Sequence, residues 1–345
     1  MNRILIVRLG ALGDIVHAIP VAAALRRAFP GARIDWLVSA KHREILDLVP
    51  VIDRRLVVRD RGDAGGGTSL MSAVRELRRS RYDVVIDLQG LIKSALIARA
   101  SGSPRVIGFA ARYLREPLAR LLYTDVHDPG GGGMYAFSET RHVVQINLGV
   151  LQALGLRTTT VEFPIESVDD SCATRMLAQS GGAFALLNPG AAWPNKRWPP
   201  TRLAAVAAAL HSKRGLRSVV LWGPGERELA DHVVAEARGA AVLAPQTTIA
   251  DIVALARAAA IMISGDTGPT HIGAAVGTPI VGLYGPTRPE RNGPWLPQDI
   301  TVSRVSICQC HHLRQCKLDT MCLLDIQADE VILAAETRLD ARTHG

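Results

Sequence analysis

Residues 3–16 decide the fold class of the chain, and their sequence is RILIVRLGALGDIV. An apolar run at 4–7 is followed by Gly10 and Gly13, and then by the start of a helical pattern. A short apolar strand that leads through a glycine turn into a helix is the opening unit of a parallel sheet covered by helices. The two glycines permit a tight turn and the close approach of a ligand to the backbone. The stretch therefore predicts an α/β domain with a ligand-binding loop after its first strand.

Alternating strands and helices continue from this stretch and start again in the second half of the chain. In the first half we expect strands at 3–8, 33–38, 56–59, 83–88 and 105–107, and helices at 15–29, 69–79, 91–100 and 139–154. In the second half we expect strands at 184–187, 218–221, 240–243, 260–263 and 280–283, and helices at 201–213, 226–237, 249–257 and 270–276. The pattern predicts two doubly wound α/β domains with parallel sheets, at 1–163 and 164–325, with a ligand cleft at the carboxyl ends of the strands. A C-terminal helix at 326–345 is expected to pack back toward the first domain.

The length and composition of the chain suit two globular domains. Its 345 residues are 48% hydrophobic and 21% charged, as in an ordinary soluble protein with two buried cores. No apolar run approaches the roughly 20 residues of a membrane span. Arg8 and Asp14 also interrupt the N-terminal apolar stretch, so it lacks the core of a signal peptide. We therefore expect a cytoplasmic protein, whose five cysteines do not form structural disulfides.

The net charge of +8 favours a polyanionic partner. The basic residues are dispersed and aromatic residues make up only 4% of the chain, so we expect no nucleic-acid partner. A membrane surface that carries phosphates fits the charge better. A merely arginine-rich composition explains the charge equally well at this stage.

Asp14 follows the glycine turn at the start of the first helix. The G-x-x-G spacing of this turn differs from the G-x-G-x-x-G of dinucleotide-binding folds, which argues against a nicotinamide oxidoreductase. The carboxylate either caps the helix or acts as a general base on an acceptor hydroxyl. Position alone favours capping. A non-catalytic module that binds a nucleotide sugar is a further alternative, against which a carboxylate at this turn argues.

Two loops of the second half have the composition of a diphosphate site. Residues 264–271, SGDTGPTH, place glycines, hydroxyls and backbone N–H groups at the start of a helix. Residues 188–199, NPGAAWPNKRWP, place Lys196 and Arg197 in a stiff loop between two tryptophans. After the next strand, Glu226 adds a carboxylate suited to ribose hydroxyls, and Glu228 is nearly as well placed.

Together these motifs resemble the ADP-heptose–lipopolysaccharide heptosyltransferases of glycosyltransferase family 9. The resemblance rests on the Gly13-Asp14 turn, Lys196, the 265–271 loop and the YGPT sequence at 284–287, and it covers nearly the whole chain. It implies the GT-B fold, in which two Rossmann-like domains face one another, the first binding the acceptor and the second the donor. Two further segments, YDVVIDLQGLIKSA at 82–95 and REPLA at 115–119, resemble the type I enzymes that act on Kdo–lipid A.

The resemblance also implies roles for individual residues. Asp14 becomes the catalytic base of a transfer from ADP-heptose that inverts the anomeric centre. The implied donor-binding residues are Lys196, Glu226, Asp266, Thr267, Gly268 and His271. The implied acceptor-binding residues are Gly13, Lys93 and Arg115. No cofactor or catalytic metal is implied, and the enzyme is expected at the cytoplasmic face of the inner membrane. Transfer to another core sugar, or to a protein, is the alternative.

Two segments depart from the family pattern. Residues 60–67, DRGDAGGG, are less basic and richer in glycine than a loop that holds phosphorylated lipid should be. A second glycine run at 130–133 also lies where an acceptor loop is expected, and these two runs read as the loosest parts of the chain. The acceptor is therefore less well determined by the sequence than the donor.

A cluster of thiols lies near the C-terminus. Its members are Cys308, Cys310, Cys316 and Cys322, with two histidines between them. The C-x-C-x5-C-x5-C spacing is not a common zinc pattern, because C-x-C strains a shared tetrahedral site. Buried thiols are the favoured interpretation, and a structural metal that staples this segment is the alternative.

Overall fold

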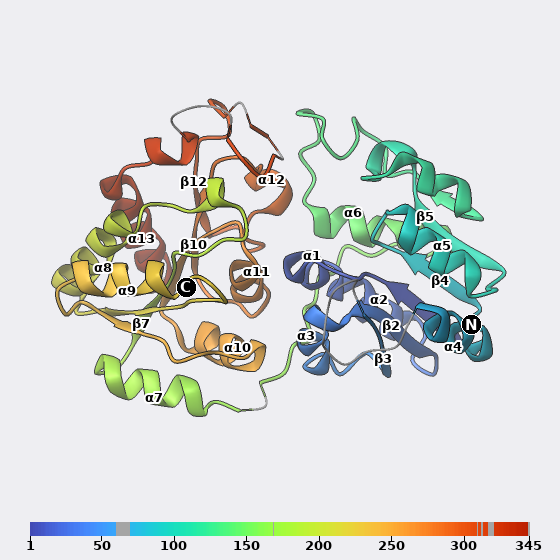
Figure 1. The fold of residues 1–345 in the computed structure, drawn as a ribbon, viewed down its shortest axis with the longest axis horizontal. Coiled ribbons are helices and arrows are strands. Elements are labelled where there is room, and N and C mark those ends of the chain that lie inside the picture. The colour runs from blue at the N-terminus through green and yellow to red at the C-terminus, as the bar shows by residue number, and fades with distance from the viewer. Residues whose placement is uncertain (60–69, 168, 309, 312, 317–320, 344–345) are drawn as a thin grey trace. The chain divides into compact units, whose positions relative to one another are not determined.

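A computed structural model describes residues 1–345 except 60–69, 168, 309, 312, 317–320 and 344–345. The chain divides into two compact units, Met1–Glu166 and Ser167–Gly345. In Figure 1 the first unit is coloured blue to green and the second is coloured green to red. The glycine-rich segment at 60–67 falls on residues outside the described part, so the expectation for it has no structural counterpart here.

The first unit is built on a six-stranded parallel sheet of order β3-β2-β1-β4-β5-β6. Its strands are β1 (Arg3–Val7), β2 (Arg33–Ser39), β3 (Arg54–Val58), β4 (Val84–Asp87), β5 (Arg105–Phe109) and β6 (Asp125–His127). The apolar run that opens the chain becomes the central strand β1, whose last four residues are buried. The strand order reverses between β1 and β4, where Val7 lies opposite Asp87. Loops that leave the carboxyl ends of such a strand pair form a ligand-binding position.

Helices cover both faces of this sheet (Figure 1). They are α1 (Leu12–Val16), α2 (Ile19–Ala28), η1 (Ala40–His42), α3 (Glu44–Asp47), α4 (Leu70–Ser80), α5 (Ile92–Ala100), η2 (Ala111–Tyr113), η3 (Pro117–Leu122), α6 (Val143–Gly149) and η4 (Val150–Leu154). Helix α2 packs on α6, while α4 packs on α5 and α5 on η3.

Two helices of the first unit differ from their predicted extents. The helix expected at 15–29 is divided into α1 and α2, because Pro20 at the start of α2 has no N–H to continue the first helix. The helix expected at 139–154 begins only at Val143, capped by the side chain of His142. Glu139 instead turns inward, where it is buried and bonded to Arg141. The hydrogen bonds of Glu139 therefore determine the backbone conformation before His142, and this segment is not helical although its sequence has a helical pattern.

The glycine run at 130–133 is tied to this buried carboxylate. Arg141 donates from Nη2 to the carbonyl oxygen of Gly130 at 2.6 Å and to Glu139 Oε2 at 2.5 Å. The hydroxyl of Tyr113 donates to Glu139 as well. Gly130, Gly131 and Gly133 have positive φ angles of 76°, 77° and 102°, which glycine adopts without steric cost. The run thus forms a folded turn that is bonded to its surroundings, where the composition alone indicated a loose loop.

The second unit repeats the architecture of the first. Its parallel sheet has the order β12-β11-β10-β7-β8-β9, which is the same winding when counted from its own first strand. The strands are β7 (Phe184–Asn188), β8 (Arg217–Val220), β9 (Ala241–Leu243), β10 (Ile261–Gly265), β11 (Ile280–Tyr284) and β12 (Ile300–Ser303). The order reverses between β7 and β10, where Asn188 lies opposite Ser264.

Two helical layers enclose this second sheet. The helices are α7 (Ser171–Ser180), η5 (Pro194–Lys196), α8 (Pro200–Arg214), α9 (Arg227–Glu236), α10 (Ile249–Ala258), α11 (Gly268–Ala275), α12 (Pro289–Asn292), η6 (Cys322–Asp325) and α13 (Ala328–Thr343). One core cluster contains residues of α8, α9 and α13, and the other contains residues of α7, α10 and α11. None of the described helices is long and apolar enough to cross a bilayer.

The C-terminal helix α13 packs on the second unit. Its buried face belongs to the core of that unit, and the expectation that the segment 326–345 packs toward the first domain stays a prediction. Val331, Ala334 and Ala335 join that core, and Arg338 forms an ion pair with the buried Asp299 at 2.9 Å. The apolar face of α13 is therefore buried within the second unit.

Candidate functional site

Two loops meet at the strand reversal of the second unit, one after β7 and one after β10. Asn188, at the end of β7, donates from Nδ2 to Ser264 Oγ at 3.1 Å and to Thr267 Oγ1 at 3.0 Å. Thr270 donates to Ser264 Oγ at 2.7 Å and to the carbonyl oxygen of Gly265 at 2.6 Å. This network of hydroxyls fixes the turn from β10 into α11. The two loops that the sequence singled out are therefore joined in one rigid structure.

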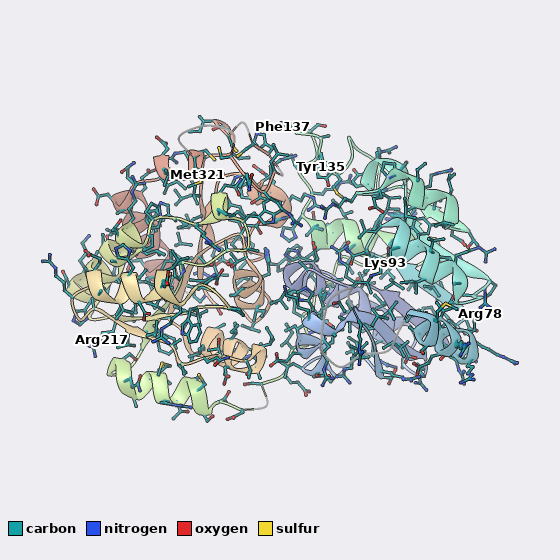
Figure 2. All side chains as sticks on the ribbon, viewed as in Figure 1. Arg78, Lys93, Tyr135, Phe137, Arg217 and Met321 are labelled. Carbon is teal, nitrogen blue, oxygen red and sulfur yellow. The ribbon has the colours of Figure 1, made fainter. Side chains whose placement is uncertain are left out.

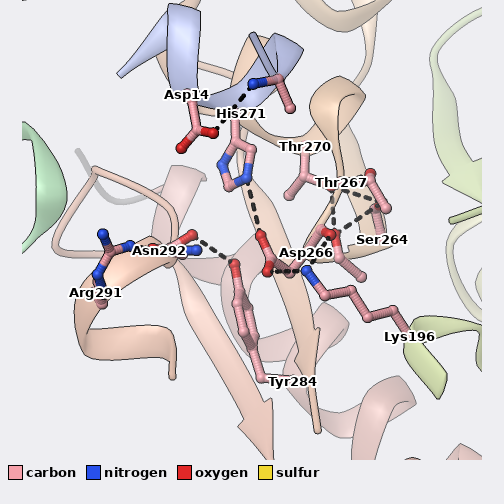
Figure 3. Close-up of polar contacts among 12 residues, drawn as sticks. Asp14, Lys196, Ser264, Asp266, Thr267, Thr270, His271, Tyr284, Arg291 and Asn292 are labelled. Carbon is pink, nitrogen blue, oxygen red and sulfur yellow. Dashed lines mark hydrogen bonds and ion pairs between the residues drawn. The ribbon is translucent and has the colours of Figure 1, made fainter. Parts of the chain in front are cut away.

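Lys196, Asp266 and His271 form a buried polar cluster in these loops (Figure 3). Lys196 Nζ lies 2.6 Å from Asp266 Oδ2, and His271 Nε2 lies 3.0 Å from Asp266 Oδ1. The Asp266 side chain is 5% exposed and that of Lys196 is 14% exposed. The ammonium group also lies 4.4 Å from the ring centre of Trp193, which adds a cation–π contact. One tryptophan of the cationic loop thus supports Lys196 directly.

The pKa of Asp266 lies well below its usual range, although burial alone would raise it. The hydrogen bond from His271 and the charge of Lys196 outweigh burial and stabilise the ionised carboxylate. A carboxylate that is fixed as an anion holds the lysine ammonium in one position. An ammonium group held in this way suits an anionic oxygen.

The N-terminus of α11 adds backbone donors to the same place. Thr267 is the extended N-cap residue, and its hydroxyl is occupied by Asn188 and Thr270. Gly268 opens the helix and is partly exposed. The first turn of a helix has N–H groups without helical partners and carries partial positive charge, so it favours phosphate. Thr267 can therefore contribute through its backbone position while its side chain holds the turn together.

Glu226 is held between two glycines at the carboxyl ends of β7 and β8. Its Oε2 accepts a hydrogen bond from the N–H of Gly223 at 3.1 Å. A side chain at Gly190 would collide with the same carboxylate. Glu228 is exposed in the first turn of α9. Of the two glutamates that the sequence left open, Glu226 is the one that lies at the edge of the sheet with the other loops.

Asp14 lies at the strand reversal of the first unit, and it is both a cap and an ion-pair partner. Its Oδ2 accepts from the N–H of Ala11 at 3.1 Å, while its Oδ1 lies 2.8 Å from Arg8 Nη2. The side chain is 39% exposed. The N-cap of α1 is Ala11, and Asp14, expected at that position, is instead the third residue of the helix and bonds back to the N-cap N–H. The carboxylate stays accessible. Gly13, on the same short helix, is buried.

Gln89 connects this turn to the loop after β4. Its Oε1 accepts from the N–H groups of Leu9 at 2.8 Å and Gly10 at 3.2 Å. The β4 loop is in turn fixed by the fully buried Asp87, which accepts from Gln89 N, Gly90 N, Ser94 Oγ and Tyr123 Oη. Both segments of the strand reversal are thus held in place by side-chain bonds.

Lys93 and Arg115 come from neighbouring, exposed segments of the first unit. Lys93 lies in the first turn of α5 (Figure 2), and Arg115 precedes η3. Glu116 Oε2 accepts from the N–H of Ile92 at 2.7 Å, which joins the two segments. Within the described part of the chain, the ion pairs include none between Arg115 and Glu116. The Glu116 carboxylate accepts from the first N–H of α5.

Comparisons with known proteins identify the family of the chain. The profile of glycosyltransferase family 9 (heptosyltransferase) matches residues 70–321. Lipopolysaccharide heptosyltransferase 1 of Pseudomonas aeruginosa is 32% identical, over 84% of this chain and 81% of that protein. The chain belongs to glycosyltransferase family 9. It is thus a heptosyltransferase by family, as the sequence motifs indicated.

Other relatives of this family 9 enzyme agree in sequence and in fold. Lipopolysaccharide heptosyltransferase 1 of Escherichia coli K12 is 28% identical, over 83% of this chain and 89% of that protein. The glycosyl transferase family 9 structure from Veillonella parvula superimposes with a TM-score of 0.79 at 26% identity, covering 99% and 97% of the two chains. The structure of E. coli heptosyltransferase WaaC with ADP gives 0.77 at 24% identity, covering 97% and 99%. The expected GT-B fold is confirmed.

Sequence analysis missed three residues that organise the enzyme's two strand reversals. Arg8 pairs with Asp14, Gln89 supports the glycine turn, and Asn188 ties the two loops of the second unit. Each is a polar residue at or just beyond the carboxyl end of a buried strand, and that position is the signal that could have identified them. Thr287, after β11, adds a hydroxyl that is buried and without a hydrogen-bond partner among the described atoms.

The four C-terminal thiols of the enzyme lie close together. Cys308 Sγ is 3.5 Å from Cys310 Sγ, and the hydrogen bonds between thiols extend to Cys316 and Cys322. Burial raises the pKa of Cys310 to about 12 and also raises those of Cys308 and Cys322. Over the described residues, no group of three or more His, Cys, Asp and Glu side chains is placed to hold a metal. Cys308 and Cys310 are buried, and a buried thiol packs as a small apolar group.

Proposed function

We propose that the enzyme transfers heptose from ADP-heptose to the Kdo region of lipid A during synthesis of the lipopolysaccharide inner core. The relatives at 32% and 28% identity are lipopolysaccharide heptosyltransferases of type 1. The segments at 82–95 and 115–119, which resemble type I enzymes, lie together in the first unit through the bond between Ile92 and Glu116.

The donor side of the proposal is carried by one observation, the buried cluster of Lys196, Asp266 and His271 at the strand reversal of the second unit. A fixed ammonium group beside a helix N-terminus suits a diphosphate. The proposed donor-binding residues are Lys196, Glu226, Asp266, Thr267, Gly268 and His271. Glu226 would accept hydrogen bonds from the ribose hydroxyls. The solved WaaC structure contains ADP, which supports ADP as the nucleotide.

In the proposed reaction, Asp14 removes the proton from an acceptor hydroxyl while that oxygen bonds to the anomeric carbon of heptose. The bond from this carbon to the ADP oxygen breaks, and ADP leaves with the electron pair. A single displacement of this kind inverts the anomeric centre. Lys196 and the dipole of α11 stabilise the charge that develops on ADP. Gly13, Lys93 and Arg115 would help to hold the acceptor, and the reaction needs no cofactor.

The proposed acceptor is a membrane lipid, so we place the enzyme at the cytoplasmic face of the inner membrane as a peripheral protein. The net charge of +8 agrees with attraction to anionic lipid phosphates.

Purified enzyme should release ADP and form a product one heptose heavier when it is incubated with ADP-heptose and a delipidated Kdo acceptor. Parallel reactions with a heptosylated core acceptor and with a protein acceptor would identify a different specificity within the family. Mass spectrometry of the product separates these outcomes, and transfer to either of the other two acceptors but not to Kdo would refute the assignment. Preference for UDP- or GDP-sugars over ADP-heptose would refute the proposed donor.

A further inference from the structure

Large apolar side chains are exposed on one surface of the first unit, formed by α5 and η3. Leu118 and Leu121 of η3 are 66% and 71% exposed, and Leu96 of α5 is 52% exposed. We call this the α5–η3 surface. Its exposed residues are Ile92, Lys93, Leu96, Arg99, Arg115, Glu116, Pro117, Leu118, Arg120 and Leu121. Leucines exposed to this extent in one place mark a surface that is covered by a partner.

Helical geometry explains why these leucines face outward together. A 3₁₀ helix repeats every three residues, so Leu118 and Leu121 of η3 lie on one face. The buried Ala119 lies on another face. On α5, Ile92, Leu96 and Arg99 are spaced by four and three residues and share the exposed side of that helix. The opposite side carries the fully buried Ala95 and Ala98.

The two helices form one continuous surface. Helix α5 packs directly on η3, and the bond from Ile92 N to Glu116 Oε2 fixes the start of α5 against the segment before η3. In Figure 1, η3 is the green-blue helical segment beside α5. The two helices therefore pack against each other within the first unit, and the exposed leucines lie outside this contact.

Exposed basic residues lie on the same two helices as these leucines and on the segment before η3. Lys93, Arg99, Arg115 and Arg120 are all exposed on the α5–η3 surface, and its exposed carboxylate, Glu116, is engaged as the cap of α5. Within the described part of the chain, Arg99 and Arg120 form no ion pair. Exposed apolar and basic side chains on one surface suit the interface of an anionic bilayer, where leucines enter the acyl boundary and cations contact phosphates.

We propose that the α5–η3 surface docks the enzyme on an anionic lipid bilayer. Charge complementarity favours a bilayer over a protein partner, because the exposed side chains of α5 and η3 are apolar or basic and the nearby carboxylate of Glu116 is bonded to Ile92 N. A heptosyltransferase that acts on lipid A needs such contact. That acceptor is itself a proposal, so the test below uses neither donor nor acceptor.

Co-sedimentation with vesicles of phosphatidylglycerol and phosphatidylethanolamine tests the surface directly. The full-length enzyme should bind these vesicles and bind phosphatidylcholine vesicles at least ten-fold more weakly. The L118E/L121E variant should lose at least ten-fold in partition coefficient while it keeps the parent melting temperature. Leu333→Glu is the matched control, because Leu333 is also 66% exposed but lies on α13 of the second unit.

A second pair of variants tests the charges. R99Q/R120Q should weaken binding to the anionic vesicles three- to ten-fold, and R175Q/R238Q, which removes two exposed arginines of the second unit, should not. The inference is overturned if the parent does not bind anionic vesicles or if L118E/L121E sediments with them like the parent. It is also overturned if L333E loses as much vesicle binding as L118E/L121E. Heptose transfer to a delipidated acceptor by L118E/L121E, at the parent rate, would show that failure to bind vesicles is separate from failure of catalysis.

Discussion

Asp14 uses its two carboxylate oxygens for different partners, the N–H of Ala11 and the guanidinium of Arg8. The Ala11 bond is a helix-start contact that an asparagine side chain can also accept. Removal of the proton from an acceptor requires the carboxylate itself. Substitution by asparagine or by alanine therefore separates the structural role from the proposed catalytic one.

Asp14→Asn should lower kcat by about 10²–10⁴ and leave ADP affinity within a few-fold of the parent. Asp14→Ala should lose as much activity and, in addition, about 1 kcal/mol of stability because the bond to Ala11 is lost. Steady-state kinetics, calorimetry with ADP and thermal melting give the three readouts. If the asparagine variant kept most of the parent kcat, Asp14 would not be the catalytic base and its role would be structural.

Lys196 should be the main cation on the diphosphate. Lys196→Ala should weaken ADP binding by about 1.5–3 kcal/mol, roughly 10- to 150-fold, in isothermal titration. This variant leaves Asp266 buried without its cation, so K196A/D266N, in which no unpaired charge remains, should be measured beside it. Lys213→Ala, which disturbs only the exposed pair with Glu336, serves as the control. If K196A/D266N bound ADP as tightly as the parent, the diphosphate would not bind at this loop.

At the scale of elements, the segment that joins α5 to η3 is where the acceptor assignment can be tested. Arg115→Ala should raise the acceptor KM by roughly five-fold, equivalent to about 1 kcal/mol. The KM for ADP-heptose should stay nearly unchanged, and the salt dependence of kcat/KM should become flatter. Arg112→Ala is the comparison, since Arg112 is exposed nearby but paired with Asp128 at 2.6 Å. An unchanged acceptor KM with a lower melting temperature would show a structural arginine.

The turn at 130–133 should make stability depend on acid pH. Hydrogen bonds from Arg141, opposed by burial and aided by Tyr113, lower the pKa of Glu139 from 4.5 to about 2. A carboxylate with a lowered folded-state pKa stabilises the protein above its unfolded pKa, and the effect is lost as pH falls toward the folded value. The contribution of Glu139 should therefore be complete above about pH 5 and should decline between pH 4.5 and 2, by at most about 1.4 kcal/mol per pH unit.

Glu139→Gln measures this contribution. The variant should melt below the parent at pH 7, and the difference should shrink as the pH is lowered to 3. Glu236→Gln, at an exposed position of α9, should follow the parent throughout. Melting curves of Glu139→Gln that stay parallel to those of the parent from pH 7 to 3 would exclude the ion pair as a source of stability.

The elements that sequence predicted well are those with continuous apolar runs. Strands β1, β4, β7, β10 and β11 are buried along nearly their whole length, so hydrophobicity alone identifies them. The edge strands β6 and β12 are short and partly exposed, and their sequences carry no such signal. The break between α1 and α2 was missed although Pro20 marks it, because the apolar pattern runs on through it.

Within the candidate site, the sequence identified loops that carry their own chemistry. Composition next to a strand end singled out the 264–271 loop and Lys196, and the structure brings the two together. The contact between Asn188 and Thr267 joins residues that are 79 positions apart, and that between Leu9 and Gln89 joins residues 80 apart. Such partners depend on which strands are neighbours in the sheet, and the pattern of a single sequence does not specify this neighbour relation.

For the whole molecule, the two units have the same strand order and one reversal each. The proposed division of labour predicts that ADP affects only one of them. At about 100 times its dissociation constant, ADP should stabilise the unit that binds it by about 2.7 kcal/mol. Hydrogen exchange should slow in peptides that cover 188–198 and 264–271 and should be unchanged in peptides that cover 84–100. Protection of 84–100 by ADP alone would contradict the assignment of the donor to the second unit.

The position of Glu226 has a consequence for how the gene can change. Its carboxylate occupies the space that a side chain at Gly190 would need, and it also lies against Gly223. In a mutational scan, a side chain at position 190 should therefore displace the Glu226 carboxylate from its bond to Gly223 and impair the enzyme, even though glycine has no side chain that could contact a substrate. Shortening Glu226 to aspartate would free part of that space and should make alanine at position 190 tolerable in the same background. The two positions are expected to vary as a linked pair among descendants of this gene, and neither should drift alone.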